Sequence, residues 1–483
     1  QSGHKEVHRD GHHRTRCTMS RSVIEDLGDG CYRVKGDPWS IGSRYELDAL
    51  IGNGSYGSVC RALDKNARPP RYVAIKKIWG VFQSRTDGLR CLREISILRR
   101  LEHPNVVGIV DVLDPTSEPI TDLYVVFEFG GSDLSKLSSV LGRLLGAEEV
   151  RKIAYQLLCA VGYLHDSQVI HRDIKPANVL IDPETMCVKL ADFGLSRVLM
   201  KGIKAAVTGQ DQDAGRGAAG PTFDGAGAGA GAQTMPRFMS EHVVTRWYRS
   251  PEVILCHGFY STKIDMWSIG CIYAELLGMM QSNRKPLFPG RSCFPFSPGD
   301  NRGSMQKVSP TDRLDQLNVI LSVIGTPDEE SIRSLHVTQD VRSYLKELKF
   351  VPPADLREKY PLASDEAIDL IRRMLLFNPD RRISIQDALK HRYFAGFPAP
   401  PVCPNAASAM LKMDLESVIG PREQMIRSLD ALIRREIHRH HQGINEIAES
   451  SSGEAPQPDL AAPGLFSDPA AGQGPAAEDP MTE

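Results

Sequence analysis

The chain has 483 residues and a formal net charge of −2, and at roughly 150 residues per domain its length suggests about three domains. It is 41% hydrophobic and 24% charged, which is typical of a soluble globular protein. The near balance of 58 Lys and Arg against 60 Asp and Glu argues against a dedicated nucleic-acid binder. No run of roughly 18 apolar residues is present, so no membrane-spanning helix is predicted.

The cysteines and the first residues bear on the cellular compartment. Ten cysteines are scattered without a Cys-x-x-Cys pair or the spacing of zinc ligands. Cys60, Cys91, Cys159 and Cys271 lie in apolar segments, which is typical of reduced, buried thiols rather than of a disulfide framework. No apolar segment follows the basic residues at the start of the chain, so no secretory signal is predicted. These features favour a protein of the cytoplasm or nucleus.

The first part of the chain reads as a leader followed by a sheet. Residues 1–40 are polar and rich in His and Arg, so we expect a disordered leader. From 45 to 130 strand patterns predominate, with clear β-rich runs at Tyr72–Ile78 and Leu123–Phe129. Apolar residues at helical spacing predict one helix near 92–101 between these two runs.

Helices predominate from 131 to 397. Ala147–His165 carries apolar residues on one face, and Lys263–Gly278 is apolar almost throughout, which predicts a buried helix. The Gly-Ala-rich residues 201–236 predict a low-complexity insertion, and residues 447–483 predict a disordered tail, because neither offers the apolar area that ordering requires. A sheet-rich part followed by a helical part predicts an α+β fold with two lobes.

A glycine pattern and a lysine are the first candidates for chemistry. Gly52–Val59 contains a Gly-x-Gly-x-x-Gly pattern, which taken alone is as compatible with an ordinary hairpin as with a phosphate-binding loop. A strand pattern continues at Ser58–Leu63, whereas a dinucleotide-binding fingerprint requires a helix there. Lys76 follows on a strand and would neutralise phosphates beneath such a loop, with Glu94 as its candidate counter-charge.

The segment His171–Asn178, followed by Asp192-Phe193-Gly194, is the more specific signal. Phosphoryl transfer needs a carboxylate that orients a hydroxyl, a cation on the moving phosphate and oxygen ligands for Mg²⁺. Asp173, Lys175, Asn178 and Asp192 offer these groups in this order. The pattern therefore predicts a phosphoryl-transfer site.

With these motifs the chain resembles the eukaryotic protein kinases over about residues 45–395. The resemblance implies ATP and Mg²⁺ as cofactors, Asp173 as catalytic base, and Lys175 and Lys76 as further catalytic cations. It implies Asn178 and Asp192 as metal ligands. The residues that it assigns to ATP binding are Ile51, Gly52, Asn53, Gly54, Ser55, Tyr56, Gly57, Ser58, Val59, Ala74, Lys76, Glu94, Phe127, Glu128 and Phe129.

Three supporting features follow from the same resemblance. Glu252 of Ser250-Pro251-Glu252 is expected to pair with Arg382, and Asp265 to hold the backbone of the catalytic loop. The ring of Phe127 is expected to narrow the back of the ATP pocket. This predicts poor binding of inhibitors that need a small residue at that position.

Within the kinases, the chain is similar to the MAP kinases. Val243–Glu252, Phe288–Gly290 and Asp315–Asn318 match segments of that family, which implies Pro-directed phosphorylation of Ser or Thr in intracellular signalling. Residues 398–446 resemble the C-terminal extension that MAP kinases wrap back onto the N-lobe, including a helix predicted over Arg422–His438. His438, His440 and His441 are expected to end that helix as a solvated terminus, a position compatible with the helix dipole. The residues implied in a substrate pocket are Thr245, Arg246 and Arg249.

The activation segment departs from the usual Thr-x-Tyr pair, because it reads Ser240-Glu241-His242. This resembles a divergent MAP kinase branch of apicomplexan parasites. Phosphorylation of Ser240 is the expected switch, and the family's phosphate-binding arginines correspond to Arg93, Arg172 and Arg197. Phe394–Ser408 contains no Asp or Glu, which puts the acidic docking patch of the family in doubt.

The partners implied are ATP, protein substrates and either an upstream kinase or autophosphorylation, with no nucleic acid, no membrane and a monomeric state. Two alternatives stay open. The first is a cyclin-dependent-type kinase, against which Cys91–Ile95 and the C-terminal extension argue. The second is a pseudokinase scaffold, which the intact Lys76, Asp173 and Asp192 disfavour.

Overall fold

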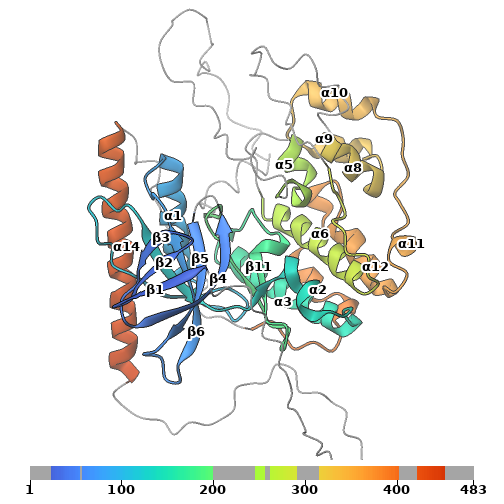
Figure 1. Cartoon of the computed structure of the whole chain (residues 1–483). Coiled ribbons are helices and arrows are strands. Elements are labelled where there is room, and N and C mark those ends of the chain that lie inside the picture. The colour runs from blue at the N-terminus through green and yellow to red at the C-terminus, as the bar shows by residue number, and fades with distance from the viewer. Residues whose placement is uncertain are drawn as a thin grey trace, which may run out of the picture.

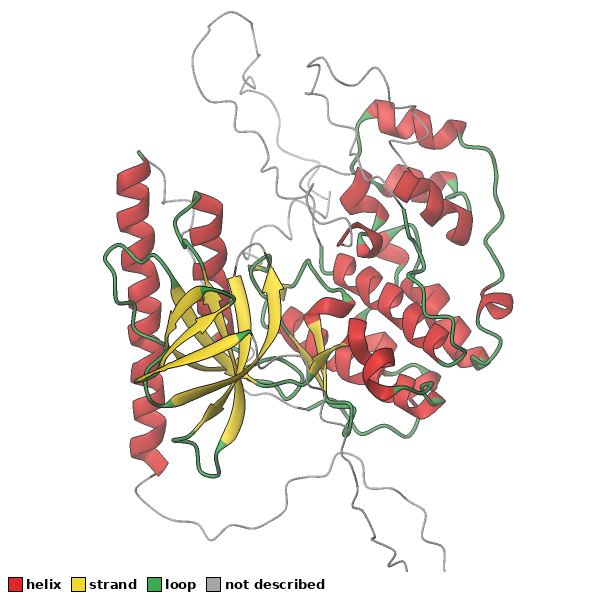
Figure 2. Ribbon diagram, viewed as in Figure 1, coloured by secondary structure: helices red, strands yellow, loops and turns green. Residues whose placement is uncertain are grey.

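A computed structural model of the chain describes residues 23–54, 57–198, 245–255, 261–290, 315–401 and 421–451. These residues form the two predicted lobes (Figure 1). Figure 2 shows that most strands gather in one lobe and most helices in the other. The predicted insertion at 201–236 lies outside the described residues.

The element bounds are as follows. The strands are β1 (Ile24–Gly28), β2 (Cys31–Val34), β3 (Asp37–Ser40), β4 (Tyr45–Gly54), β5 (Gly57–Asp64), β6 (Arg71–Ile78), β7 (Ile109–Val112), β8 (Leu123–Glu128), β9 (Ser132–Asp133), β10 (Val169–Ile170), β11 (Val179–Ile181), β12 (Val188–Leu190) and β13 (Arg197–Val198). The α-helices are α1 (Arg85–Leu98), α2 (Leu137–Leu141), α3 (Ala147–Asp166), α5 (Pro251–Leu255), α6 (Lys263–Met279), α8 (Asp315–Ile324), α9 (Glu329–Ser334), α10 (Gln339–Glu347), α11 (Leu356–Lys359), α12 (Asp365–Met374), α13 (Ile385–Leu389) and α14 (Arg422–Ser451).

The N-lobe is built on a five-stranded antiparallel sheet of order β4-β5-β6-β8-β7, with β6 at its centre. Side chains alternate across this central strand. Val73 and Ile75 belong to the core on the outer face of the sheet, whereas Ala74 belongs to the core on the inner face, toward α1. The alternation places Lys76 on the inner face and Lys77 on the outer face.

A second, three-stranded sheet of order β1-β2-β3 covers the outer face of the N-lobe sheet. Tyr32 and Trp39 are buried in that shared core. The prediction of a disordered leader over 1–40 is therefore wrong for residues 24–40, and residues 1–22 lie outside the described residues. Each of these short strands contributes only one or two bulky side chains to the core, so a composition averaged over a polar stretch does not reveal them.

Two long helices form the core of the C-lobe, as the apolar patterns predict. Helix α3 buries one face, and at its start the backbone N–H of Gly146 donates to Oε2 of Glu149 at 2.8 Å. Helix α6 is buried almost throughout, and Trp267 on it stacks against Phe288 with ring centroids 5.3 Å apart. An apolar sequence without a polar face thus forms a helix that is surrounded on all sides.

Helix α14 lies against α1 on the N-lobe, as Figure 1 shows. Its buried residues Leu429, Ile433 and Ile437 belong to the same core as the apolar face of α1. The C-terminal segment therefore returns to the N-lobe, as expected.

The bounds of α14 correct two expectations. The helix continues beyond the predicted end at His438 as far as Ser451, so the histidines lie within it and residues 447–451 are not part of a disordered tail. Glu446, Ala448 and Glu449 favour a helix, and the next helix breakers are Gly453 and Pro456. A polar, Ala-rich composition does not distinguish a helix end from a tail.

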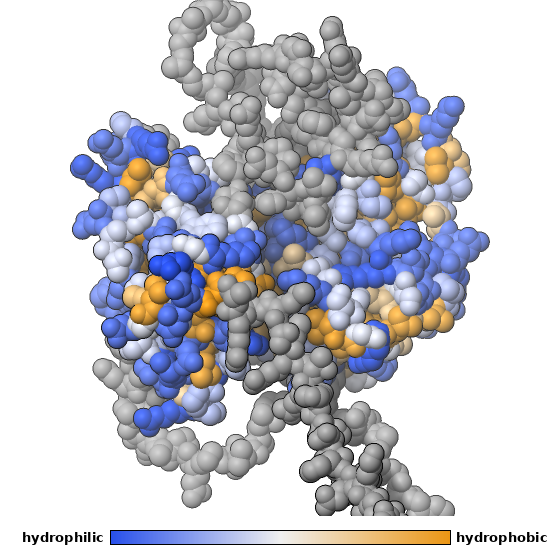
Figure 3. All heavy atoms as spheres, viewed as in Figure 1, coloured by the Kyte–Doolittle hydropathy of each residue, from blue (hydrophilic) through white to orange (hydrophobic). Residues whose placement is uncertain are grey.

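The cysteines of the described residues form no disulfide, as their scattered spacing predicts. Among the described residues, Cys31, Cys60, Cys91, Cys159, Cys187 and Cys271 are free. In that same part of the chain no helix is both long and apolar enough to span a membrane. On the face drawn in Figure 3, hydrophilic residues predominate, and apolar residues form separate areas on both lobes.

Candidate active site

The glycine pattern forms the turn between β4 and β5, and a strand follows it rather than a helix. Asn53 pairs with Ser58 across the hairpin, and the Ser58 hydroxyl donates to Oδ1 of Asn53 at 2.7 Å. A Cβ at Gly57 would lie 2.0 Å from the carbonyl oxygen of Lys77, so only glycine fits there. The strand after the glycines is confirmed and excludes a dinucleotide-binding fingerprint, whereas phosphate binding by this turn stays a prediction. Ser55 and Tyr56 lie outside the described residues.

Lys76 on β6 meets Glu94 on α1. The Lys76 ammonium donates to both carboxylate oxygens of Glu94, at 2.7 and 2.8 Å. Burial lowers the pKa of Lys76, but the carboxylates of Glu94 and Asp192 outweigh burial, and the pKa stands above its ordinary value. Lys76 is therefore a protonated cation that Glu94 holds in place near Asp192.

The catalytic-loop candidates converge on one carboxylate. The Lys175 ammonium donates to Oδ2 of Asp173 at 2.7 Å, and the Asn178 amide donates to Oδ2 at 3.0 Å and to the Asp173 carbonyl at 2.8 Å. Oδ1 of Asp173 is buried and has no hydrogen-bond partner among the described residues. One oxygen of Asp173 is thus held and the other is left to accept a proton or a hydroxyl hydrogen bond.

Asp265, at the start of α6, holds the backbone of this loop. Its Oδ2 accepts from the N–H of His171 and its Oδ1 from the N–H of Arg172, both at 2.9 Å, and the imidazole of His165 lies 2.9 Å from Oδ2. Burial raises the pKa of Asp265, but the hydrogen bond to His165 and the nearby His171 outweigh it, and the pKa is lowered. Arg172 has a left-handed backbone, with φ of 71°. A charged carboxylate therefore stabilises a strained loop.

Asp192 supplies a second carboxylate, close to Lys76 and Lys175. Burial raises its pKa, but the positive charges of Lys76 and Lys175 and the nearby His171 outweigh it, and the pKa is lowered. The backbone carbonyl of Asn178 accepts from the N–H of Ala191 at 2.9 Å, which joins Asn178 to the residue directly before Asp192. A carboxylate and a side-chain amide oxygen are the kinds of donor that Mg²⁺ prefers, so the residue types at Asp192 and Asn178 fit the ion.

The predicted back of the ATP pocket lies on β8. Phe127 is buried and pairs in register with Ala74 on β6. Glu128 accepts from the Lys189 ammonium at 2.7 Å. Phe129 is partly buried against the main core, and its ring centroid lies 6.4 Å from that of Tyr72. Among the other pocket residues, Val59 packs against the inner core, whereas Ile51 is exposed.

The three predicted phosphate-binding arginines lie together, and two more join them. Burial lowers the pKa of Arg93 to about 10, with the positive charges of Arg197, Arg172, Arg90 and Arg85 adding to the effect. Arg85 and Arg90 were not predicted here, because they precede the helix expected near 92–101, whereas α1 begins at Arg85 and carries both. Ser240, the expected phosphorylation site, lies outside the described residues.

The end of the activation segment is anchored to the C-lobe. The Trp247 indole donates to the Gly290 carbonyl at 2.8 Å, and the Tyr248 hydroxyl donates to Glu275 at 2.5 Å. Arg382 donates to both oxygens of Glu252, at 2.5 and 2.6 Å, in a fully buried pair. The expected pairing of Glu252 with Arg382 is confirmed.

The segment with Thr245 and its neighbours forms a short helical turn. Thr245–Tyr248 is a 3-10 helix, and the N–H of Arg249 donates to the carbonyl of Arg246 at 3.2 Å. The structure does not describe the Thr245 side chain. The predicted substrate-pocket residues are therefore close together in the backbone.

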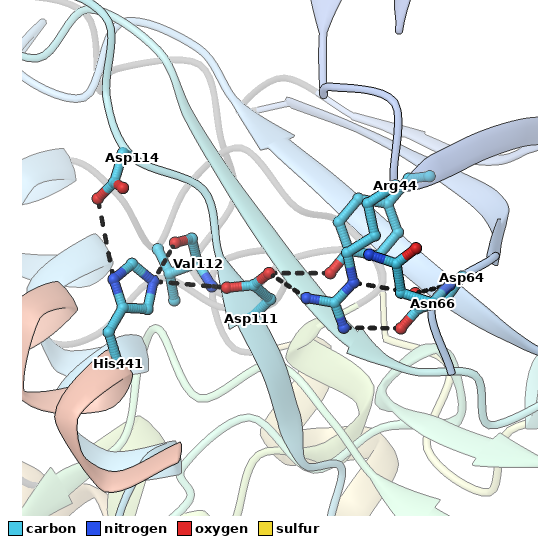
Figure 4. A network of polar contacts seen from close by, with 8 residues as sticks. Arg44, Asp64, Asn66, Asp111, Val112, Asp114 and His441 are labelled. Carbon is cyan, nitrogen blue, oxygen red and sulfur yellow. Dashed lines mark hydrogen bonds and ion pairs between the residues drawn. The ribbon is translucent and has the colours of Figure 1, made fainter. Parts of the chain in front are cut away.

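The C-terminal helix binds the N-lobe through polar contacts as well. Asp430 accepts from the N–H of Ile120 at 2.7 Å. Figure 4 shows His441 beside the edge strand β7, with Nε2 donating to the Val112 carbonyl at 2.9 Å. Asp111 on that strand accepts from Arg44 at 2.9 Å, so the network extends from α14 to the start of β4.

Comparisons with known proteins agree with this geometry. The protein kinase domain family matches residues 45–394. Mitogen-activated protein kinase 7 of Arabidopsis thaliana is 34% identical over 407 residues, which cover 84% of this chain and 93% of the relative. Mitogen-activated protein kinase 3 of Oryza sativa subsp. japonica is 36% identical over 359 residues, 74% of this chain and 80% of the relative. Extracellular signal-regulated kinase 1 of Dictyostelium discoideum is 35% identical over 376 residues, 77% of this chain and 59% of the relative. The chain therefore belongs to the protein kinase family and, within it, to the serine/threonine-specific mitogen-activated protein kinases.

Proposed function

We propose that Asp173 orients the substrate hydroxyl while the ATP γ-phosphate is transferred to Ser or Thr. This role rests on the different environments of the two oxygens of its carboxylate. Oδ2 is held by Lys175 and Asn178, and Oδ1 is buried without a partner among the described residues. An oriented acceptor of this kind lowers the barrier through positioning and proton removal.

Lys76 and Lys175 supply positive charge in this proposal. Lys76, fixed by Glu94, is assigned to the α- and β-phosphates, and Lys175 to the moving phosphoryl group. Family membership implies ATP and Mg²⁺, and Asp192 and Asn178 are the residues that we assign to the ion. Bound Mg²⁺ supplies charge neutralisation on the phosphate oxygens.

The test compares Asp173→Asn with the unchanged chain in a radiolabelled-phosphate assay on a Ser-Pro peptide. We expect kcat to fall by at least ~10³-fold, because the hydroxyl loses its acceptor, while thermal stabilisation by ATP and Mg²⁺ is retained. Lys76→Met is expected to weaken that stabilisation. Full activity in Asp173→Asn would contradict the assignment, and absent ATP stabilisation in the unchanged chain would favour a scaffold.

We also propose that phosphate on Ser240 binds the cluster of Arg93, Arg172 and Arg197. A phosphate carries about −1.5 to −2 charge and accepts bidentate hydrogen bonds from arginine. The lowered pKa of Arg93 supports this, because five neighbouring cations repel one another until an anion joins them. Ser240→Ala should abolish activation, and mass spectrometry before and after incubation with ATP separates autophosphorylation from the action of an upstream kinase. Full activity of Ser240→Ala would rule out this switch.

Two finer assignments complete the proposal. Arg246 and Arg249 border the pocket that favours proline after the phosphoacceptor, and paired Ser-Pro and Ser-Ala peptides test this by kcat/KM. We place the active chain in the cytoplasm or nucleus as a monomer, a state that light scattering measures directly.

A further inference from the structure

Asp37 on β3 makes contacts that reach the catalytic lysine's strand, although it lies outside the matched residues 45–394. Its carboxylate accepts from the Lys77 ammonium at 3.1 Å (Oδ1) and 2.9 Å (Oδ2). Its Oδ2 also accepts from the Trp79 indole N–H at 3.1 Å. One side chain of the covering sheet thus binds two residues of the N-lobe at the end of β6.

Lys77 is an unusually placed cation. Its side chain is only 2% exposed, and its ammonium also donates to the Pro38 carbonyl at 2.6 Å and lies 3.2 Å from Asp122 Oδ2. Burial lowers the pKa of Lys77, but its hydrogen bonds to Asp37 and Asp122 outweigh burial, and the pKa is raised. The ammonium therefore stays charged, and both carboxylates are needed to compensate for its burial.

The same two carboxylates hold the start of the connection from β6 to α1. Trp79 is bound to Asp37, and the next residue, Gly80, donates its N–H to Oδ1 of Asp122 at 3.0 Å. Val81 follows, with its N–H bound to the Thr121 carbonyl at 2.9 Å. This connection ends at the N-cap of α1, the helix that carries Glu94.

Lys76 and Lys77 are neighbours on β6 with side chains on opposite faces. Lys76 binds Glu94 of α1, while Lys77 binds Asp37 of the covering sheet. A shift of β6 or of its connection to α1 would therefore change the Lys76–Glu94 geometry directly. We propose that Asp37 is a positioning residue that holds β6 and the start of the β6–α1 connection in the register that joins Lys76 to Glu94.

This inference rests on the proposed roles of Lys76 and Glu94 in binding ATP. Asp37 binds Lys77 on the outer face of the sheet, whereas Lys76 lies on the inner face, so its effect passes through the strand and the helix. Misplacement of a phosphate-binding cation by a fraction of an ångström is expected to reduce kcat/KM for ATP by ~10-fold. The covering sheet is then a working part of the catalytic domain rather than an appendage.

The test uses Asp37→Asn in the full chain, assayed at a temperature where calorimetry shows it to be folded. We expect kcat/KM for ATP to fall ~10-fold, mainly through KM. Asp37→Glu is expected to recover part of the loss. The matched control is Glu25→Gln on the same sheet, which removes an exposed ion pair with Arg33 and should leave kcat/KM unchanged.

Trp79→Phe provides a second variant in case Asp37→Asn does not fold. It removes the indole N–H bond to Asp37 without unpairing Lys77, and we expect a smaller fall, ~3-fold, in the same constant. The double variant Asp37→Asn, Glu94→Gln tests whether Asp37 acts through the Lys76–Glu94 pair. If Asp37 acts through the Lys76–Glu94 pair, it should not weaken ATP binding further in titration calorimetry of that double variant.

The possible results distinguish failure of the role proposed for Asp37 from failure of the role proposed for Lys76. Loss of melting temperature with kcat/KM equal to that of Glu25→Gln would show a purely structural role and overturn the inference. Additive losses of ATP affinity in the double variant would overturn it as well. Undiminished ATP binding in Lys76→Met would instead overturn the role proposed for Lys76, whatever Asp37→Asn does.

Discussion

Glu436 on α14 accepts a hydrogen bond from Nε of Arg99 at 2.5 Å, which joins the C-terminal helix to the end of α1, 337 residues earlier in the chain. Arg100 donates to the same carboxylate oxygen at 3.1 Å. Glu436 is almost completely buried. Helix α1 therefore has one face toward Lys76 and another bound to a helix from the far end of the sequence.

Replacing Glu436 by Gln should destabilise the chain by roughly 2–3 kcal/mol, because three arginines, Arg99, Arg100 and Arg439, lose a buried charged acceptor. Burial raises the pKa of Glu436, but Arg99 and Arg100 outweigh burial and the pKa is lowered. Its contribution is thus present above the ordinary carboxyl pKa of roughly 4.3 and is lost as pH falls through the lower folded value. Urea unfolding at several pH values measures this, with the exposed Glu423→Gln as control. Equal stability of the two variants at pH 7 would refute the contribution.

His103 predicts a second pH dependence. It is buried, stacks on Tyr163 with ring centroids 5.0 Å apart, and its Nδ1 accepts from the Asn105 N–H at 3.0 Å. Burial, aided by the charge of Lys189, lowers its pKa to about 4. Between the ordinary value of roughly 6.5 and the folded value, the unfolded chain binds the additional proton, so stability falls as pH falls.

The expected loss at this site is roughly 2 kcal/mol between pH 7 and pH 5. Denaturant midpoints of the unchanged chain and of His103→Asn measure it, and the variant should lose this part of the slope. His438→Asn, at an exposed position, is the control and should keep the full slope. An identical pH dependence in all three proteins would contradict the lowered pKa.

Phe127 should control access to the back of the ATP pocket. Its buried ring pairs in register with Ala74, and we expect it to occupy the space that inhibitors with a bulky aromatic group require. Phe127→Gly is expected to lower the half-inhibition concentration of such a compound by more than ~10-fold, whereas a small ATP-competitive compound should be affected much less. Potent inhibition of the unchanged chain by the bulky compound would show that the ring does not close the pocket.

Gly131, between β8 and β9, should tolerate a side chain poorly. It has φ of 85°, and a Cβ would lie 2.4 Å from the Ile181 carbonyl oxygen. Gly142 has φ of 62° but no atom within 4 Å of such a Cβ, so it reports the backbone strain alone. Gly142→Ala should cost ~1 kcal/mol and Gly131→Ala clearly more, because the clash is added to the strain. Thermal unfolding of both variants measures the difference between the two stability losses. Equal losses would show that β11 moves away from the added methyl group.

Much of the fold could be predicted because its signals are local. The apolar residues of α3 recur at helical spacing, and α6 is apolar almost throughout, so both helices follow from the sequence. The site could be predicted because phosphoryl transfer fixes residue types at short spacing: Asp173, Lys175 and Asn178 lie within six residues and meet on one carboxylate.

What could not be predicted depends on contacts between distant segments. Trp39 is one of a few large residues in a polar stretch, and its burial becomes apparent only when β6 and β8 supply the facing core. Arg85 and Arg90 are ordinary helix-surface residues until the fold brings Arg172 and Arg197 beside them. The end of α14 depends on the extent of a helix in polar sequence, which composition does not determine.

The β1-β2-β3 sheet and helix α14 both cover the N-lobe, and both lie outside the residues that match the protein kinase family. A chain cut to residues 45–394 would match the family completely. It would nevertheless lose both Trp39 and Leu429, which are buried against the outer sheet face and α1 respectively. The fragment would expose two apolar surfaces and leave Lys77 without Asp37, so the boundaries of sequence similarity and those of a stable, soluble fragment differ at both ends of this chain.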